Sequence, residues 1–363
     1  MTAGPIMIMA GGTGGHVFPG LAVADELKAR HCDVVWLGTH RGLEARLVPQ
    51  HGIEIEWITI AGVRGKGVLA WLAAPFRIAG AVLEALRALR RRRPSAVLGM
   101  GGFVSGPGGV AAWLARKPLL IHEQNSVAGT TNRLLAPLAQ RVFEAFPGSF
   151  PAGVRAELIG NPVRRSLAPG EAPRARLTAR RAERRRVLVI GGSQGARILN
   201  ETLPRALAEL PVAARPEVWH QAGRTGFEAA RAAYAAAGVS ARVVEFIEDM
   251  GAAYQWADLV VARAGALTVS ELATIGVGAI LVPFKAAIDD HQTRNARHFV
   301  GEGAGVLIAE RDLTPAGLAA ALRECLEDFD RLVAMAEAAH AKVQAAAAEK
   351  LAAACLEAAG VRA

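Results

Sequence analysis

Two glycine-rich turns are the parts of this sequence best suited to chemistry. The first, Gly11–Gly15 (GGTGG), is followed by His16, and the second is Gly191–Gly195 (GGSQG). Glycines let backbone amides come close to a diphosphate, and the N-terminus of a following helix adds partial positive charge. That charge stabilises an anion by about 0.3–1 kcal/mol, which anchors a ligand without catalysing its reaction. The turns therefore predict two phosphate sites.

Neither turn has the form that binds a dinucleotide. The first turn departs from the G-x-G-x-x-G spacing, and the next apolar run ends at Gly38, where an NAD-binding fold places an acidic residue. An NAD site is therefore disfavoured. The alternative, a glycine turn needed only for close packing, leaves the neighbouring Thr13 and His16 unexplained.

The second turn also fits a different chemistry, the G-x-S-x-G nucleophile elbow of serine hydrolases. Ser193 would then be the nucleophile, with Asp249 or Asp258 as the acid and His291 as the base. This interpretation leaves the first turn without a role. A third glycine segment, Gly101–Gly109, also follows an apolar run. Three such turns at the carboxyl ends of strands predict one cleft between two domains.

The elements that would carry these turns alternate along the chain. Apolar runs predict strands at Ile6–Ala10, Asp33–Gly38, Ile53–Ile58, Ser95–Met100, Pro118–Glu123, Val187–Gly192, Pro216–Gln221, Arg242–Ile247, Asp258–Arg263 and Gly278–Phe284. Helices are expected between them, among others at Leu21–Arg30, Leu69–Leu89 and Pro107–Ala115. Near-continuous apolar strands separated by helices are typical of parallel sheets buried on both faces. The pattern predicts two doubly wound α/β domains.

The boundary between the domains is expected after Asn161–Arg164. The following stretch, Leu167–Arg186, is rich in Pro, Ala and Arg without a hydrophobic period, which predicts a linker or an exposed segment. The chain ends in an alanine-rich helix, near Met335–Ala359, that we expect to pack back on the first domain.

Composition excludes several other classes of protein. The formal charge of +9 favours acidic partners such as phosphates, nucleic acid or an anionic membrane. Three scattered cysteines without C-x-x-C spacing argue against a disulfide framework and a zinc site. A signal peptide and a run of about 20 apolar residues are both lacking, so we expect a cytoplasmic enzyme that could still bind a membrane surface.

Longer segments carry a resemblance to a known family. Between Gly11 and Ala296 the chain contains, in order, GGTGGHVFPGLAVA, GMGGFVSGPGG, HEQNSVAGTTNR, IGNPVR, GGSQGAR, FIEDMGAAYQWADLVVARAGALTVSELA and DDHQTRNA. This series resembles the MurG family of N-acetylglucosaminyltransferases, which convert lipid I to lipid II in peptidoglycan synthesis.

The resemblance implies a fold and an activity. The fold is GT-B, with two Rossmann-like domains around a cleft: an acceptor and membrane domain at residues 1–162, which the helix in 341–363 packs against, and a UDP-sugar domain at 163–340. The activity is inverting transfer of GlcNAc from UDP-GlcNAc to the 4-hydroxyl of lipid I. The partners would be these two substrates and an anionic membrane surface on the cytoplasmic face, without a specific nucleic acid and without a cofactor.

The resemblance also implies roles for individual residues. Arg164 and Ser193 would bind the donor diphosphate, Glu271 the ribose, and Asn125 and Gln292 the sugar. The remaining donor-side positions are Thr13, Gly14, Ile247, Arg263, Ala266, Leu267 and His291. The acceptor side would be Gly12, Gly15, His16, Gly102 and Ser105. The sequence departs from relatives at Phe103, where some have tyrosine, at Ala264, where serine is frequent, and at His291, where some have glutamine.

Inversion at an anomeric carbon needs a base for the attacking hydroxyl and positive character for the departing diphosphate. A histidine titrates near neutral pH, so His16 is the first candidate base; alternatively it only donates to a phosphate. Glu123 is the second candidate, unless it supports Asn125. Arg164, Ser193 and a helix N-terminus could replace a metal at the leaving group, so no metal site is expected. The D-x-D at Asp328–Asp330 is expected to lie on a surface helix.

A membrane-binding face is expected around residues 67–78, which include Val68, Leu69, Trp71, Leu72 and Phe76. Arg77, Arg87 and the run Arg90–Arg93 follow. At about 1 kcal/mol per basic residue near an anionic surface, the run alone would contribute about 4 kcal/mol. The alternative is a core-facing helix with a solvated basic end. Aromatic residues are not interleaved with the basic runs, which argues against specific nucleic-acid binding.

Overall fold

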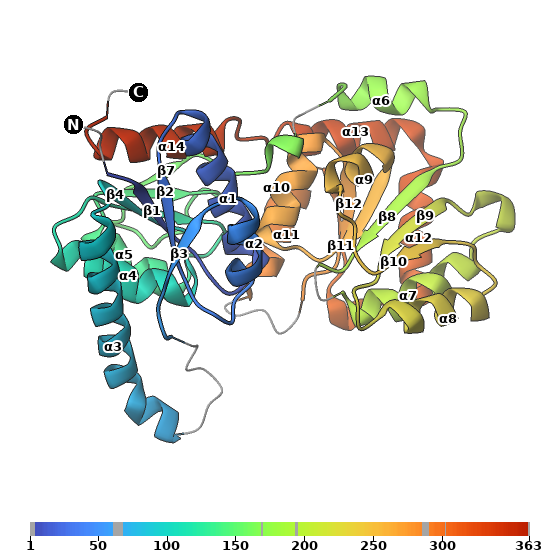
Figure 1. The fold of residues 1–363 in the computed structure, drawn as a ribbon. Coiled ribbons are helices and arrows are strands. Elements are labelled where there is room, and N and C mark those ends of the chain that lie inside the picture. Colours follow the sequence, from blue (N-terminus) through green and yellow to red (C-terminus); the bar gives the residue numbers. More distant parts are fainter. Residues whose placement is uncertain are drawn as a thin grey trace. The chain divides into compact units, whose positions relative to one another are not determined.

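The computed structural model describes residues 4–60, 68–167, 170–192, 195–284, 290–301 and 303–361, with backbone only for 68–73. The chain divides into two compact units (Figure 1). Unit 1 contains Met1–Arg164 and Gln344–Ala363, and unit 2 contains Arg165–Val343. The divisions fall beside the boundaries expected at 162/163 and 340/341.

Unit 1 is built on a seven-stranded parallel sheet in the order β3-β2-β1-β4-β5-β6-β7. Its strands are β1 (Ile6–Met9), β2 (Val34–Gly38), β3 (Glu54–Trp57), β4 (Ala96–Gly99), β5 (Leu119–Glu123), β6 (Arg141–Glu144) and β7 (Ala156–Leu158). The central strand β1 is apolar throughout because both of its faces are covered. Ile6 and Ile8 face one core, and Met7 and Met9 face another.

Helices cover both faces of this sheet. They are α1 (Gly14–Ala29), α2 (Glu44–Gln50), α3 (Val68–Arg92), α4 (Gly102–Leu114), α5 (Thr130–Leu135) with the short η1 (Ala136–Leu138), and α14 (Ala347–Ala358). Side chains of α1 and α14 pack in the core with Ile6 and Ile8, whereas α3 and α4 pack with Met7 and Met9. The last helix of the chain therefore completes the core of the first unit.

Unit 2 is built on a six-stranded parallel sheet in the order β10-β9-β8-β11-β12-β13. Its strands are β8 (Arg186–Ile190), β9 (Glu217–Gln221), β10 (Arg242–Val244), β11 (Leu259–Ala262), β12 (Gly278–Leu281) and β13 (Gly305–Leu307). Its helices are α6 (Pro173–Ala179), α7 (Arg197–Ala208), α8 (Phe227–Ala236), α9 (Met250–Trp256), α10 (Ala266–Ile275), α11 (His291–Val300), α12 (Pro315–Glu327) and α13 (Phe329–His340). The described residues of this unit also form the short 3-10 helices η2 (Arg165–Leu167), η3 (Val212–Ala214) and η5 (Glu310–Asp312). The two doubly wound parallel-sheet domains predicted from the sequence are confirmed.

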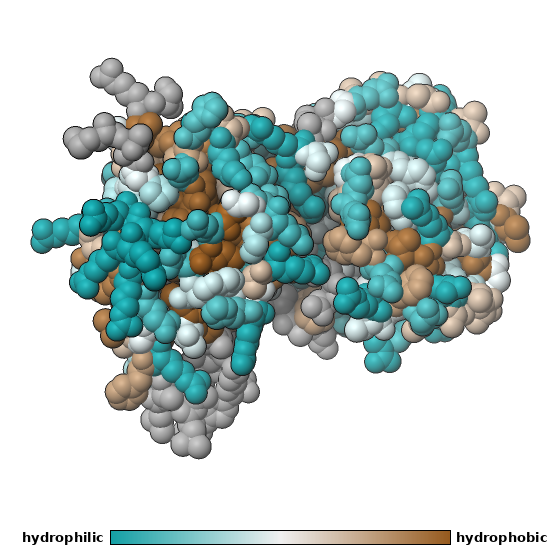
Figure 2. Space-filling model, viewed as in Figure 1, coloured by the Kyte–Doolittle hydropathy of each residue, from teal (hydrophilic) through white to brown (hydrophobic). Residues whose placement is uncertain are grey.

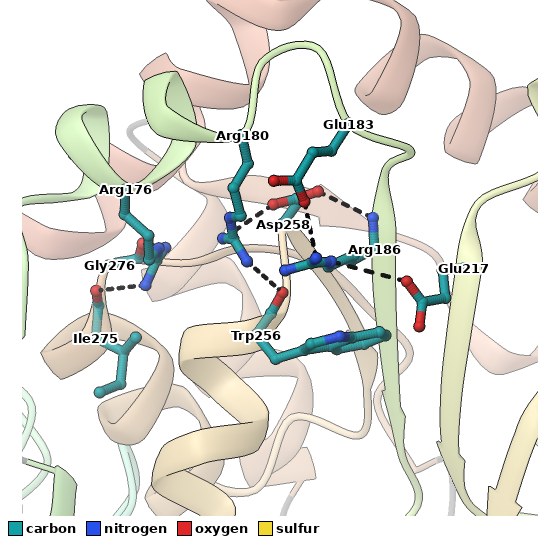
Figure 3. A network of polar contacts seen from close by, with 9 residues as sticks. All are labelled: Arg176, Arg180, Glu183, Arg186, Glu217, Trp256, Asp258, Ile275 and Gly276. Atoms are coloured by element: carbon teal, nitrogen blue, oxygen red, sulfur yellow. Dashed lines mark hydrogen bonds and ion pairs between the residues drawn. The ribbon is translucent and has the colours of Figure 1, made fainter.

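The stretch 167–186 is not the exposed linker that its composition indicated. It contains η2 and α6, and it is attached to the amino-terminal edge of the unit 2 sheet (Figure 3). Arg180 forms an ion pair with buried Asp258 at 3.1 Å, and it donates to the Trp256 carbonyl at 2.8 Å. Arg176 is buried and donates to the carbonyls of Ile275 and Gly276. Arg176 and Arg180 are therefore anchors, because both reach acceptors at the edge of the sheet.

Three further predictions about elements were wrong. The alanine-rich end of the chain is two helices, α13 and α14, one in each unit. Helices α1 and α4 begin at Gly14 and Gly102, directly in the glycine turns and several residues before the starts expected at Leu21 and Pro107. The short strand β6 and the short edge strands β7 and β13 were not anticipated, because three or four residues carry too little periodicity.

Candidate functional site

The glycine segments of unit 1 meet at the carboxyl ends of β1, β4 and β5. A Cβ at Gly102 would lie 2.4 Å from the Gly11 carbonyl oxygen, and one at Gly101 would lie 2.9 Å from His16 Nδ1. Both residues also have positive φ, of 79° and 91°. Only glycine tolerates this backbone and this approach. The third glycine segment thus allows the first turn and His16 to lie against it.

His16 is half-buried and is held by a chain of side chains from β5. Its Nδ1 lies 2.8 Å from Gln124 Oε1. Gln124 Nε2 lies 3.0 Å from His122 Nδ1, and His122 Nε2 lies 2.9 Å from the Gly160 carbonyl oxygen. His122 and Gln124 are buried, and burial lowers the pKa of His122 to about 4. His122 is therefore neutral near pH 7.

Glu123 lies between these two residues in sequence and is equally buried, but its side chain has different partners. One carboxylate oxygen accepts from the backbone amide and the side-chain amide of Asn125, at 2.9 and 3.1 Å. The other accepts from the Gly129 amide and from Asn132 Nδ2, at 3.0 and 2.9 Å. Four such bonds occupy the acceptor positions of this carboxylate, so none is directed to a substrate hydroxyl. Of the two roles considered for Glu123, its contacts favour support of Asn125.

Glu44 was not anticipated as a site residue, yet it fixes the first glycine turn. Its buried carboxylate accepts from the Gly12 amide at 3.0 Å and from the amide and hydroxyl of Thr39, at 3.0 and 2.8 Å. The Gly12 amide is thereby directed to a carboxylate instead of a phosphate. Ser105 is also fully buried, and its hydroxyl contacts the carbonyls of Met9 and Gly101. These contacts give Gly12 and Ser105 partners within the fold, and the acceptor contacts expected for them stay predictions.

The remaining residues expected in unit 1 surround the same edge. Thr13 is exposed and precedes α1 in an extended conformation, and Gly14 and Gly15 form the first turn of that helix. Arg164, the last residue of the unit's first segment, lies over the ring of Phe18 in α1 at 4.3 Å. This stacking places Arg164 beside the first glycine turn. Asn125 is half-buried at the end of β5.

In unit 2 the glycine turn follows β8, and Ser193 lies outside the described residues. Buried Gln221, at the end of β9, holds the described part of the turn. Its Nε2 donates to the Gly192 carbonyl, and its Oε1 accepts from the Ile247 amide, both at 3.0 Å. Gln221 therefore connects the predicted diphosphate turn to the segment expected to contact the base. Ile247 itself is buried.

The other expected donor-side residues lie after β11 and β12. Arg263 pairs with Glu310 and donates to the carbonyls of Val282 and Pro283. Glu271 in α10 is buried and accepts from the Tyr254 hydroxyl at 2.9 Å. Ala266 begins α10, followed by half-buried Leu267, and His291 begins α11. Gln292 Oε1 accepts from the Phe284 amide at 2.9 Å. Together these residues form the carboxyl edge of the second sheet.

The hydrolase alternative does not fit this geometry. Asp258 lies at the amino end of β11, opposite the edge that carries the glycine turn after β8, and it is paired with Arg180. Asp249 caps α9, where it accepts from the Ala252 amide. Both candidate acids are thus engaged elsewhere. In the D-x-D segment, Asp328 caps α13 by accepting from two amides of its first turn.

Sequence reasoning missed His122, Gln124, Glu44 and Gln221. A signal for the first two is the alternation of a strand, in which residues 122 and 124 point to one face and 123 to the other. Glu44 and Gln221 carry no local signal, because their partners are backbone groups distant in sequence.

Comparison with known proteins places the chain in a class. Residues 6–144 match the glycosyltransferase family 28 N-terminal domain, and residues 186–351 match the glycosyltransferase family 28 C-terminal domain. A glycosyltransferase from kitacinnamycin biosynthesis has the same fold, with a TM-score of 0.67 at 19% identity over 97% of this chain and 99% of that one. The chain is therefore a glycosyltransferase of the GT-B fold, as predicted.

Nearer relatives define the family within that class. The UDP-N-acetylglucosamine–N-acetylmuramyl-(pentapeptide) pyrophosphoryl-undecaprenol N-acetylglucosamine transferase of Nitrosococcus oceani is 59% identical over 97% of this chain and 98% of its own. The enzyme of the same name from Marinobacter nauticus is 54% identical over 97% of each chain. Acinetobacter baumannii MurG is 39% identical, with a TM-score of 0.81 over 98% of this chain and 99% of its own. The chain belongs to this N-acetylglucosaminyltransferase family, the MurG family.

The described residues contain neither a membrane-spanning helix nor a cluster of metal ligands. No helix among them is both long and apolar enough to cross a bilayer. Within the same residues, no cluster of three His, Cys, Asp or Glu side chains could hold a metal ion.

Proposed function

We propose that this enzyme transfers GlcNAc from UDP-GlcNAc to the 4-hydroxyl of MurNAc-pentapeptide-diphosphoryl-undecaprenol, lipid I, to give lipid II. The observation that carries the proposal is identity of 52–59% to enzymes named for this reaction, over 97% of the chain. The chemistry is a single displacement. The acceptor oxygen bonds to the anomeric carbon while the bond from that carbon to the diphosphate breaks, and the electron pair leaves with UDP.

On the acceptor side, His16 takes the proton of the attacking hydroxyl. Its Nδ1 faces Gln124, so Nε2 is the nitrogen that accepts this proton. Exposed Thr13 and the first turn of α1 lie next to it and support placing the acceptor diphosphate there. Glu123 holds Asn125 in position to contact the sugar.

On the donor side, the second turn with Ser193 receives the diphosphate, and Arg164 contributes positive charge to it. Glu271 binds the ribose, and Arg263, Ala266, Leu267 and the Ile247 segment surround the base, while His291 and Gln292 contact the sugar. Support comes from the position of these residues at the carboxyl edge of the unit 2 sheet, where ligands bind in open α/β folds.

An anionic membrane on the cytoplasmic face is the surface from which the enzyme takes its lipid-linked acceptor. Helix α3 projects from the sheet of unit 1 (Figure 1) and presents Phe76, Ile78 and Leu83 to solvent, with Phe76 82% exposed. Val68, Leu69, Trp71 and Leu72 have side chains outside the described residues. Hydrophobic areas lie among hydrophilic ones on the visible face of both units (Figure 2), so exposed apolar residues alone do not locate the membrane face.

The basic run at the end of α3 helps to locate the membrane-binding face. Within the basic run, Arg91 pairs with Glu56, and Arg92 pairs with both Glu54 and Glu56. Only Arg90 and Arg93 of that run then add net attraction, which reduces its expected contribution from about 4 to about 2 kcal/mol. Vesicles containing anionic lipid test this. The double variant Arg90→Ala/Arg93→Ala should bind them about thirtyfold more weakly, whereas Arg197→Ala in unit 2 should bind like wild type; equal binding by all three refutes the docking role.

The activity is tested with radiolabelled UDP-GlcNAc and a short-chain lipid I analogue. Label that moves to the lipid, and depends on both substrates, supports the proposal. Label that remains in UDP-GlcNAc, or appears only as free GlcNAc, contradicts it. Esterase activity that disappears in Ser193→Ala would instead revive the hydrolase interpretation.

A further inference from the structure

The chain His16–Gln124–His122–Gly160 joins a half-exposed imidazole to a buried carbonyl through two buried side chains. We propose that Gln124 and His122 are positioning residues which fix the proton of His16 on Nδ1, so that Nε2 holds the lone pair that receives the acceptor proton. The proposal rests on the function proposed above for the role of His16, and it adds two residues and a tautomer to that function.

The first step of the argument is the far end of the chain. The Gly160 carbonyl can only accept a hydrogen bond, so His122 Nε2, 2.9 Å away, must carry a hydrogen. His122 is neutral, because burial lowers its pKa to about 4. A neutral imidazole has one N–H, so His122 Nδ1 is an acceptor.

The second step fixes the amide of Gln124. One end of this amide lies 3.0 Å from His122 Nδ1 and 3.2 Å from the His122 carbonyl oxygen, and both of these atoms are acceptors. The NH2 group must therefore occupy this end, and the oxygen must face the other way. The backbone is held as well, because Asn161 Nδ2 donates to the Gln124 carbonyl at 3.0 Å. These hydrogen bonds hold both the side-chain amide and the backbone of Gln124 in one orientation.

The third step reaches the reacting group. Gln124 Oε1 is an acceptor 2.8 Å from His16 Nδ1, so Nδ1 is the donor in this bond. Which ring nitrogen of a histidine is protonated is set by the hydrogen bond that the other one makes. In a neutral His16 the lone pair is consequently on Nε2. A free histidine side chain favours the opposite tautomer, so the chain selects the form that accepts a proton at Nε2.

The burial of His122 and Gln124 explains why one tautomer of His16 is maintained. His122 is fully buried and Gln124 is 1% exposed, so water does not compete for these bonds. A protonated His122 would direct an N–H at the NH2 group of Gln124, but that state is reached only near pH 4. The absence of a Cβ at Gly101 allows the His16 ring to come within reach of Gln124.

Nitrogen-15 NMR of histidine-labelled enzyme measures the tautomer directly, without relying on activity. The sequence has 9 histidines, and His16 is assigned by the signals missing from His16→Ala. We expect neutral His16 of the wild type to carry its proton on Nδ1. In Gln124→Met, which keeps the volume but removes both bonds, the proton should move to Nε2. A wild-type proton on Nε2, or an unchanged tautomer in Gln124→Met, overturns the proposal.

Kinetics separate positioning from a structural role. Gln124→Met should lower kcat on the order of 10²-fold with nearly unchanged KM, because the wrong tautomer removes the base and leaves substrate binding intact. Gln124→Glu keeps an acceptor oxygen opposite His16 Nδ1, so it should keep the tautomer and recover part of kcat. Gln140→Met, at an exposed glutamine of the same unit, is the matched control and should behave as wild type.

The two proposals fail in different ways. Absence of GlcNAc transfer by the wild type would contradict the proposed function, while the NMR measurement would still decide the tautomer. Should Gln124→Met not fold, Gln124→Glu and His122→Phe provide the test: the first should keep the Nδ1 proton and the second should weaken that preference. A similar loss of kcat with an unaltered tautomer in His122→Phe would contradict the relay.

Discussion

Both units bury polar groups at a sheet edge, but at opposite edges and with different chemistry. At the carboxyl edge of unit 1, His122 and Gln124 are neutral and lead to half-exposed His16. At the amino edge of unit 2, Arg180 and Asp258 are charged and attach α6 and the segment after it to the sheet (Figure 3). We propose that the first arrangement orients the base that meets substrate, whereas the second attaches a segment of the chain to the sheet. A network of buried polar side chains indicates a ligand site only when it leads to a group that a ligand can reach.

The largest expected effect is at the amino edge. Asp258→Ala would remove the buried carboxylate that pairs with partly buried Arg180 and accepts from the Arg186 amide, and breaking a buried pair in this way costs about 3–5 kcal/mol in the free energy of unfolding. Urea unfolding followed by fluorescence measures it.

Two controls accompany Asp258→Ala. Glu217→Ala removes an exposed carboxylate beside Arg186 and should change the free energy of unfolding by less than about 0.5 kcal/mol. Arg180→Met/Asp258→Leu removes both charges and should lose less than the single variant. Equal stability of Asp258→Ala and wild type would show that the ion pair is not what holds this segment.

A pH series compares the buried histidines of the two units. Burial lowers the pKa of His122 to about 4 and that of His220 to about 3, whereas the unfolded chain titrates near 6.5. As pH falls below 6.5, the unfolded state binds protons that the folded state does not. The free energy of unfolding should therefore fall with decreasing pH, by about 1.4 kcal/mol per pH unit for each histidine until its folded pKa is reached.

The contribution of each histidine to the pH dependence is obtained by comparing variants with wild type, because carboxylates titrate in the same pH range. His122→Gln and His220→Gln should each flatten the slope between pH 6 and 4.5 by about that amount. His40→Gln, at an exposed position, should retain the wild-type slope. A slope unchanged by both buried substitutions would mean that the two rings accept protons in the folded state.

His16→Ala should lower turnover but not stability, in contrast to Asp258→Ala, which should lower stability. Loss of the base should lower turnover at least about tenfold, since general base catalysis contributes about 10²–10⁴-fold. Because His16 is half-exposed, the urea midpoint should stay close to that of the wild type. Near-normal turnover would eliminate His16 as base and leave it a contact to phosphate.

The predictions from the sequence succeeded for buried apolar strands and failed for elements held by buried polar side chains. The buried strands β1–β5 and β8–β12 were predicted to within a few residues, because short apolar runs that alternate with helices are typical of parallel strands covered on both faces. Helix α6 was not, because Arg176 and Arg180 look like solvent-exposed residues until their carbonyl and carboxylate acceptors are known. His16 stood out beside its glycines, whereas the roles of Gln124 and His122 depend on Gly160, which follows two strands later.

The smallest expected effect is at the outer side of the amino edge. Arg174 in α6 and Glu337 in α13 form two hydrogen bonds, at 2.8 and 2.9 Å, in a geometry as good as that of the buried pair. Both side chains are exposed, however, so water and salt replace most of what the pair contributes. Glu337→Ala should leave the urea midpoint unchanged at about 0.15 M salt. A loss approaching that of Asp258→Ala would show that α6 is held by its exposed face, and that burial does not distinguish the two pairs.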